Sequence, residues 1–350
     1  MGTQLLKDTL AAKISTRIKA AVVGAGIIGV STAIQILELV PGVQVTLISE
    51  DFSPNTTGDG SAGFWCPYLL GDLPKDTLRK WCQDTYDFLL NLYLTPESND
   101  YGIGLLSAYF LYEKPFEVPQ FADYFTSYRK LTEKDLKLFP SQYKYGAFAT
   151  TFYTECTKLI PFLMKRFQDK HGKIIKRKIT SFSELAGEYH IVINCTGIGA
   201  SQIVSDSKLK PIRGQVIRVK APWVKHAILA SPYYILPNSE TVILGGTSQV
   251  DDWNCEVDEN DHKKIFQGCC KIVPSLKKAE IVNKWVGLRP GRSMPRIEHE
   301  TTFINGKKLE IIHNYGHGGS GVTLFWGCAK EVVDKLQELK NTIYLQQAKL

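Results

Sequence analysis

The sequence predicts an α/β fold in which a parallel-sheet domain is interleaved with a mainly antiparallel-sheet domain. Two patterns indicate this arrangement. A glycine-rich turn at residues 24–29 joins a short apolar segment to an apolar helix, as in a βαβ unit. Short alternating segments between residues 215 and 246 are typical of antiparallel strands. At 350 residues, the chain is long enough for two domains.

The first βαβ unit is expected to begin near residue 19. Residues 20–23 read as a buried strand, and residues 27–39 as an apolar-periodic helix that Pro41 and Gly42 stop. Residues 43–49 alternate and then run apolar, as a second parallel strand would. The three elements together predict one strand–helix–strand unit.

The rest of the chain adds elements to both domains. We expect a helix over residues 76–93 and a buried strand over residues 190–195. Three short strands lie within residues 215–246. A strand over residues 308–313 leads into the glycine-rich segment YGHGGSG, and an amphipathic helix over residues 329–346 follows.

Composition excludes several classes of function. The net charge of +7 comes from dispersed basic residues, and the denser run at residues 165–178 lacks the interleaved aromatics of a nucleic-acid site. Three glycines interrupt the apolar run at residues 20–40, which also holds Gln35 and Glu38, so no membrane span is predicted. The eight cysteines form no CxxC pair, which favours reduced thiols inside a cell.

The glycine turn predicts a dinucleotide site. In Gly24-Ala25-Gly26-Ile27-Ile28-Gly29, the first glycine permits a tight turn and the second lets the backbone approach a pyrophosphate. The third glycine lets the helix pack closely on the strand. The helix N-terminus offers N–H groups to the phosphates, and Glu50, at the end of the next strand, can accept from a ribose hydroxyl.

The turn alone does not decide between NAD and FAD. A long loop of threonines, glycines and small residues follows Glu50 and runs to residue 65. Such a loop suits a cofactor that stays bound with its ring system against the backbone, whereas an NAD domain usually proceeds to another helix. An NAD-dependent dehydrogenase and a plain surface loop remain alternatives at this point.

Five motifs resemble the family of D-amino-acid oxidases and D-aspartate oxidases. They occur in the family's order between about residues 19 and 340: the glycine unit followed by TTGDGSAGFW, then NCTG, RGQ, WVGLRP, and IIHNYGHGGSGVT with the following WGCA. The resemblance implies an FAD-binding Rossmann-like domain with an interleaved substrate-binding domain. It assigns residues 19–75, 145–205 and 305–345 to the FAD-binding domain, and residues 76–144 and 206–304 to the substrate-binding domain.

The resemblance also implies the residues that hold FAD. Gly24, Gly26 and Gly29 would hold the pyrophosphate, Glu50 and Asp51 would lie at the ribose, and Thr56 and Thr57 would lie near the phosphates. Gly63 and Phe64 would face the isoalloxazine ring. The pyrimidine edge of the ring would contact Gly318, Gly319, Ser320, Gly321, Val322 and Thr323.

For the substrate, the resemblance points to Arg289 as the residue that binds the α-carboxylate and to Tyr234 as its partner, with Tyr233 as the alternative. The carbonyl of Gly319 would accept from the amine. Hydride would pass from the substrate Cα to flavin N5, and dioxygen would reoxidise the flavin. The products would be a 2-oxo acid, ammonia and hydrogen peroxide.

No residue is needed as a general base in this scheme, so His313 and His317 are expected to pack rather than react. A catalytically inactive nucleotide-binding protein is the alternative from another class.

Neutral D-amino acids are the expected substrates. D-aspartate oxidases carry a second arginine where this chain has Ser248, and residues 224–233 hold only Lys225 and His226 where another family arginine stands. Burying a second carboxylate without a cation is unfavourable. D-aspartate oxidation is the alternative, with Arg292, Lys225 or His226 supplying the charge.

The segment Ala348-Lys349-Leu350 is similar to the Ser-Lys-Leu peroxisomal address, so a peroxisomal location and binding to the import receptor are expected. The other expected partners are a D-amino acid and dioxygen. The sequence leaves the oligomeric state open, and a homo-oligomer is one alternative.

Overall fold

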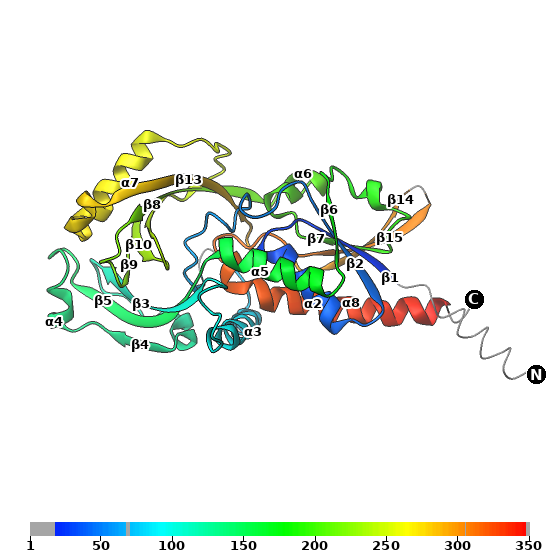
Figure 1. The fold of residues 1–350 in the computed structure, drawn as a ribbon, viewed down its shortest axis with the longest axis horizontal. Coiled ribbons are helices and arrows are strands. Elements are labelled where there is room, and N and C mark those ends of the chain that lie inside the picture. The colour runs from blue at the N-terminus through cyan, green and yellow to red at the C-terminus, as the bar shows by residue number, and fades with distance from the viewer. Residues whose placement is uncertain (1–17, 68–70, 305, 348–350) are drawn as a thin grey trace, which may run out of the picture.

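Two β-sheets and the helices packed on them form the fold (Figure 1). The computed structural model describes residues 18–67, 71–304 and 306–347. The predicted targeting tripeptide Ala348–Leu350 lies outside the described residues, so its role stays a prediction.

The first sheet has six strands in the order β14-β15-β7-β1-β2-β6. The strands from β15 to β6 are parallel, and β14 pairs antiparallel with β15 at one edge. Their bounds are β1 (Ile18–Val23), β2 (Val43–Ser49), β6 (Lys173–Lys176), β7 (Ile191–Asn194), β14 (His299–Ile304) and β15 (Lys307–His313).

Alternation along β1 explains how this sheet is buried. Ala20 and Val22 belong to a core shared with the helices, while Ala21 and Val23 face a second apolar cluster on the other side of the sheet. Successive side chains point to opposite faces of a strand, so a strand that is apolar throughout is buried on both faces.

Helix α2 (Ile27–Leu39) lies beside α5 (Cys156–Asp169) and α8 (Gly321–Gln347) (Figure 1). The buried side chain of Gln35 donates to the carbonyl of Trp326 at 2.8 Å and so ties α2 to α8. Helix α3 (Lys75–Tyr93) packs on the other side of α8, where Phe88 stacks on Trp326 with ring centroids 3.6 Å apart.

The expected start of the last helix at residue 329 is wrong, because α8 begins at Gly321. The glycines at its N-terminal end look like a continuing loop in the sequence. In the structure, Leu324, Phe325 and Cys328 are fully buried against α2 and α3, and this packing outweighs the low helix propensity of glycine.

The second sheet has nine strands. Eight follow the order β12-β8-β11-β10-β9-β3-β5-β4, and β13 also pairs with β8. All pairs are antiparallel except β3–β9. The bounds are β3 (Ile103–Tyr112), β4 (Ser127–Lys130), β5 (Tyr145–Thr154), β8 (Lys210–Lys220), β9 (Ala227–Ala230), β10 (Tyr233–Pro237), β11 (Val242–Gly245), β12 (Gln249–Val250) and β13 (Glu280–Gly291).

Helix α7 (Glu259–Ile272) covers one face of this second sheet (Figure 1). Ile265 and Cys269 on α7 share an apolar cluster with Ile217 and Leu244 of the sheet. The remaining short helices are α4 (Glu133–Leu136) and α6 (Ala200–Ile203), with single 3₁₀ turns at Gln120–Tyr124, Phe182–Leu185, Gly197–Gly199 and Pro274–Lys278.

The fold agrees with the predicted α/β class with a mainly antiparallel second sheet. Two strands cross the predicted domain limits: β5 lies in the second sheet although residues 145–205 were assigned to the first domain, and β14 lies in the first sheet although residues 206–304 were assigned to the second. The domain limits themselves stay a prediction. Within the described ranges, no helix combines the length and apolarity needed to cross a membrane.

Candidate active site

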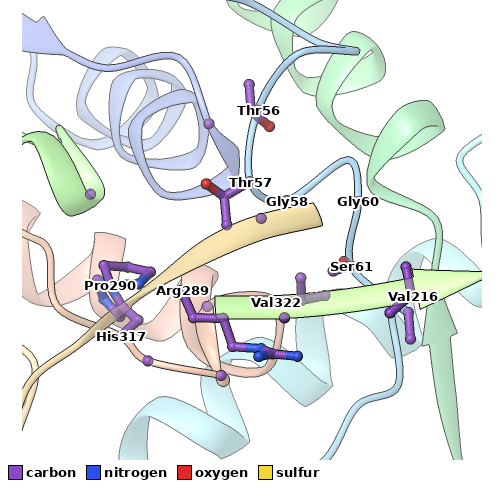
Figure 2. Close-up of a pocket in the computed structure, with 18 of the residues that line it drawn as sticks. Thr56, Thr57, Gly58, Gly60, Ser61, Val216, Arg289, Pro290, His317 and Val322 are labelled. Carbon is purple, nitrogen blue, oxygen red and sulfur yellow. The ribbon is translucent and has the colours of Figure 1, made fainter. Parts of the chain in front are cut away.

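A cavity of about 870 Å³ opens where the two sheets meet. Its walls come from the glycine turn between β1 and α2, the loop after β2, strands β8, β10 and β13, helix α7, and the loop that enters α8. Figure 2 labels several of the residues that line this cavity: Thr56, Thr57, Gly58, Gly60, Ser61, Arg289, His317 and Val322. Segments far apart in the sequence therefore meet in one site.

The glycine turn forms one end of the cavity. Gly24 has a φ of 107°, which L side chains rarely adopt, and a Cβ there would lie 2.3 Å from the carbonyl oxygen of Cys195. A Cβ on Gly29 would lie 1.8 Å from the carbonyl oxygen of Gly24. Gly26 precedes α2 and has no side chain to cap it, so the N–H groups of the first helical turn face the cavity end.

The loop after β2 is held by the buried carboxylate of Asp59. The hydroxyls of Ser53 and Thr56 donate to it at 2.6 and 2.7 Å, and the backbone N–H of Thr56 donates at 2.9 Å. Charge-assisted hydrogen bonds of this kind are the stronger ones in proteins. Because the Thr56 hydroxyl is already hydrogen-bonded to Asp59, its main role in this structure is to hold the loop in place. Thr56 and Thr57 both line the cavity.

The far end of this loop is fastened to β5. The backbone N–H of Thr154 donates to the carbonyl of Gly63 at 2.8 Å, and the N–H of Trp65 donates to the carbonyl of Phe152 at 3.0 Å. Gly63 has a φ of 71°, and a Cβ there would lie 2.1 Å from the carbonyl oxygen of Thr154. The wall that Gly63 and Phe64 present to the cavity is therefore rigidly placed on the second sheet.

The C-terminal glycine loop forms the opposite wall. The N–H of Gly318 donates to the carbonyl of Pro290 at 2.8 Å, which brings the loop against the end of β13. Among the described residues, the buried Asn314 Oδ1 and His317 Nε2 have no hydrogen-bond partner, and both residues line the cavity. Buried polar atoms without partners are unfavourable, so this wall is built to receive a polar ligand.

The two histidines of this segment differ in position. His317 lines the cavity, and complete burial lowers its pKa to about 4, so it is neutral near pH 7. His313 is fully buried in the first sheet and does not line the cavity; its Nδ1 accepts from the side-chain amide of Asn194 at 3.1 Å.

Arg289 projects from β13 into the cavity (Figure 2). One guanidinium nitrogen donates to the carbonyl of Thr247 at 3.1 Å. The group lies flat against Gly214 of β8, where a Cβ would stand 2.3 Å from Arg289 Nη1. A guanidinium has five donors, so this arrangement leaves donors directed toward the cavity.

Tyr234 also uses glycine for its placement. A Cβ on Gly245, its cross-strand partner, would lie 2.0 Å from the Tyr234 ring, so the ring rests on the bare backbone of β11. Tyr233 turns the other way and packs over Gly268 of α7. Both tyrosines touch the cavity.

Most of the predicted site residues line this one cavity. They are Gly24, Ala25, Gly26, Ile27, Ile28, Glu50, Asp51, Thr56, Thr57, Gly63, Phe64, Tyr234, Arg289, Gly318, Gly319, Gly321 and Val322. Three others do not line it. Gly29 packs against Gly24, Ser320 is fully buried, and the Thr323 hydroxyl donates to the carbonyl of Cys66 at 2.9 Å.

The predicted ribose contact has a competitor. Glu50 is half exposed, and its carboxylate lies 2.9 Å from Nζ of Lys178. Such a surface pair contributes little to stability, so the carboxylate remains available to a ligand hydroxyl.

None of the cations considered for a second carboxylate lines the cavity. Arg292 is paired with Asp206 at 3.0 Å, and the His226 ring packs edge-on against Tyr109. Lys225 is likewise absent from the cavity walls, whereas Ser248 and Lys264 of α7 are present. The sequence analysis missed Lys264, because on an amphipathic helix it looks like any solvated lysine.

The fold and the cavity define a nucleotide-binding class of α/β protein, in which the glycine turn opens onto a second sheet that carries an arginine and a tyrosine. Residues 19–335 match the model of a protein family described as FAD dependent oxidoreductase, and the chain belongs to this family. FAD is thus the cofactor. The glycine cradle and the unpaired Asn314 and His317 atoms fit such a ligand.

Two relatives are similar over most of their length. A protein named D-amino acid oxidase from Dugesia ryukyuensis is 43% identical over 318 residues, which is 89% of this chain and 95% of that protein. A protein named D-aspartate oxidase from Homo sapiens is 40% identical, over 92% of this chain and 96% of that protein. The resemblance drawn from the motifs is thereby confirmed.

The fold is also similar to that of solved structures. Glycine oxidase from Bacillus cereus superposes with a TM-score of 0.73 at 17% identity, covering 92% of this chain and 95% of that one. L-proline dehydrogenase from P. horikoshii gives a TM-score of 0.71 at 15% identity, covering 92% and 94%. At these identities the likeness shows the fold alone, and it confirms the predicted class.

Proposed function

We propose that this chain catalyses the oxidative deamination of D-amino acids with its FAD. The observation that carries the proposal is that Arg289 and Tyr234 line the same cavity as the glycine cradle at Gly24–Ile28. The names of the two relatives supply the D-amino acid as the substrate class. The products would be a 2-oxo acid, ammonia and, with dioxygen as the acceptor, hydrogen peroxide.

Arg289 binds the α-carboxylate in this proposal. A planar guanidinium offers two parallel donors to a carboxylate, which sets the orientation of the substrate as well as its charge. The Tyr234 hydroxyl shares the carboxylate, and the carbonyl of Gly319 accepts from the amine. With the carboxylate and the amine both fixed, only the D enantiomer would point its Cα–H toward the flavin.

When bound, FAD would supply the acceptor for the hydride that leaves the substrate Cα. The chain contributes orientation, because a well-placed reactant gains a large effective concentration. His317 stays neutral near pH 7 and adds no positive charge to the cavity. No side chain is required to remove a proton from Cα.

We propose further that neutral D-amino acids are preferred over D-aspartate. Ser248 lines the cavity at the position where D-aspartate oxidases are expected to carry an arginine. A serine hydroxyl offers one neutral donor, which compensates the loss of water around a carboxylate less well than a cation does. D-aspartate would therefore bind weakly.

The visible spectrum of the FAD-loaded protein tests both statements. Anaerobic D-alanine should bleach the flavin absorbance, L-alanine should leave it unchanged, and D-aspartate should bleach it far more slowly. Persistent colour with every D-amino acid would overturn the proposed activity. Faster bleaching by D-aspartate than by D-alanine would overturn the neutral preference alone.

A further inference from the structure

Among the described residues, Trp285 is the one tryptophan that lines the cavity. It lies on β13, the strand that also carries Arg289. Residues two apart on a strand share a face, so Trp285, Gly287 and Arg289 belong to the same side of β13. The position between the indole and the guanidinium thus holds no side chain.

The indole ring of Trp285 occupies space that two glycines leave free. A Cβ on Gly287 would lie 1.9 Å from Cη2 of the ring, so the ring leans along β13 toward Arg289. A Cβ on Gly60, in the loop after β2, would lie 2.0 Å from Cε2 and 2.1 Å from Cζ2. The ring therefore packs directly on the backbone of this loop.

Arg218 of β8 holds the same part of the loop. Its guanidinium donates to the carbonyls of Asp59 and Ser61 at 3.1 and 3.3 Å, on either side of Gly60. Trp285 pairs with Val216 across the β8–β13 ladder, two residues from Arg218, so both side chains project from one face of the sheet. The indole and the guanidinium together fasten the loop to the second sheet.

The indole N–H of Trp285 is available to a ligand. In the part of the chain that the structure describes, it has no hydrogen-bond partner, and it is not one of the buried polar atoms that lack one. The nitrogen is bonded to Cε2, the ring atom nearest to the Gly60 position, so the N–H lies at the edge of the ring that meets the loop. Gly58, Gly60 and Ser61 line the cavity there (Figure 2).

We propose that Trp285 is an FAD-binding residue, whose ring holds the loop at Gly60 and whose N–H donates to an oxygen of the cofactor. An indole N–H can only donate, and FAD carries oxygen acceptors on its phosphates, hydroxyls and ring carbonyls. The loop and the glycine turn line the same cavity as Trp285, which makes the cofactor the matching ligand. The assignment concerns FAD alone and applies whichever D-amino acid is oxidised.

Titration of FAD into the apoprotein tests this assignment. Trp285→Phe keeps an aromatic ring and removes the N–H, so Kd for FAD should rise about fivefold or more, as expected for a lost hydrogen bond. Trp285→Leu removes the ring as well and should raise Kd further. Trp223→Phe is the matched control, because Trp223 is 47% exposed, donates its N–H to Ser275 and does not line the cavity. Its Kd should stay within about twofold of the wild type.

A second variant displaces the ring without replacing it. In Gly60→Ala, the new Cβ would stand 2.0 Å from the indole, so the ring must move and Kd for FAD should rise. Added to Trp285→Leu, the same change should have a smaller effect, because the ring that it displaces is gone. Equal effects of Gly60→Ala in the two backgrounds would contradict the contact between the loop and the indole.

The urea midpoint of each apoprotein separates binding from folding. A lower midpoint with an unchanged Kd for FAD would make Trp285 a packing residue and overturn the assignment. A raised Kd in Trp285→Leu but not in Trp285→Phe would overturn the donor role of the N–H. A raised KM for D-alanine with an unchanged Kd would place the indole at the substrate instead. A wild-type protein that binds FAD but oxidises no D-amino acid would overturn the proposed function, and the Kd values would still decide the role of Trp285.

Discussion

The backbone N–H of Gly318 donates to the carbonyl of Pro290 at 2.8 Å, which joins the C-terminal glycine loop to the strand that carries Arg289. One end of this bond lies in the wall that faces the flavin in the proposed function, and the other follows the arginine expected at the substrate carboxylate. The bond therefore fixes the position of the glycine loop relative to Arg289. Because a displacement of about 1 Å can lower a rate greatly, this backbone contact contributes directly to positioning.

The carboxylate-binding role of Arg289 predicts the behaviour of Arg289→Lys. The variant keeps the charge and loses the planar pair of donors. We expect KM for D-alanine to rise about tenfold or more, since hydrogen bonds to charged groups contribute about 1.5–3 kcal/mol. Steady-state kinetics measure the change, and an unaltered flavin spectrum serves as the control for FAD binding. Unchanged KM and kcat would contradict the role of Arg289 in binding the substrate carboxylate.

A side chain at position 214 is expected to weaken substrate binding by displacing Arg289. In Gly214→Ala, the added Cβ would stand 2.3 Å from Arg289 Nη1, so the guanidinium must move. KM for D-alanine should rise, while FAD affinity stays the same. The matched control is Gly199→Ala, where the new Cβ would meet Thr196 at an ordinary 3.7 Å. If both variants behave like the wild type, Gly214 does not seat the guanidinium.

Replacing Asp59 is expected to weaken FAD binding. Asp59→Ala leaves the Thr56 N–H and the Ser53 hydroxyl without their acceptor; both groups are partly buried, so each loss should cost about 1 kcal/mol, the lower end of the range for unpaired polar groups. The loop should loosen, and Kd for FAD should rise at least about tenfold when FAD is titrated into the apoprotein. Asp72→Ala is the control, because Asp72 is exposed. Equal affinities in the two variants would contradict the bracing role of Asp59.

Local signals explain which elements the sequence predicts well. The bounds of α2 and β2 agree with expectation, because the glycine turn, Pro41 and Gly42 mark their ends within the segment itself. The long strands β3 and β5 went unpredicted. They pair with each other across more than thirty intervening residues, so their stability depends on partners that no local pattern reveals.

The site residues divide in the same way, into those that local motifs identify and those that tertiary packing places. Residues in contiguous motifs, such as Gly24–Ile28 and Gly318–Gly319, line the cavity, and their contact with FAD stays a prediction. Thr323 does not, because α8 begins earlier than predicted and turns this side chain toward Cys66. Lys264 is placed by the packing of α7 on the second sheet, and a helical wheel shows only that it lies on a polar face.

The burial of His317 is expected to make the stability of the folded protein depend on pH. Burial holds its pKa at about 4 in the folded protein, against an ordinary value near 6.5 in the unfolded chain. Between these values the unfolded chain binds the extra proton, so stability falls as the pH decreases from about 6.5 toward 4. The full difference amounts to roughly 3 kcal/mol at about 1.4 kcal/mol per pKa unit.

His317→Asn removes this titration, so its urea midpoint should decrease less than that of the wild type between pH 7 and pH 4.5. The FAD-loaded proteins are compared, with His171→Asn as the control, because His171 is exposed. The wild type and the control should lose stability in parallel while His317→Asn loses less. Three parallel curves would contradict the assignment of His317 as a buried, neutral imidazole in the folded protein.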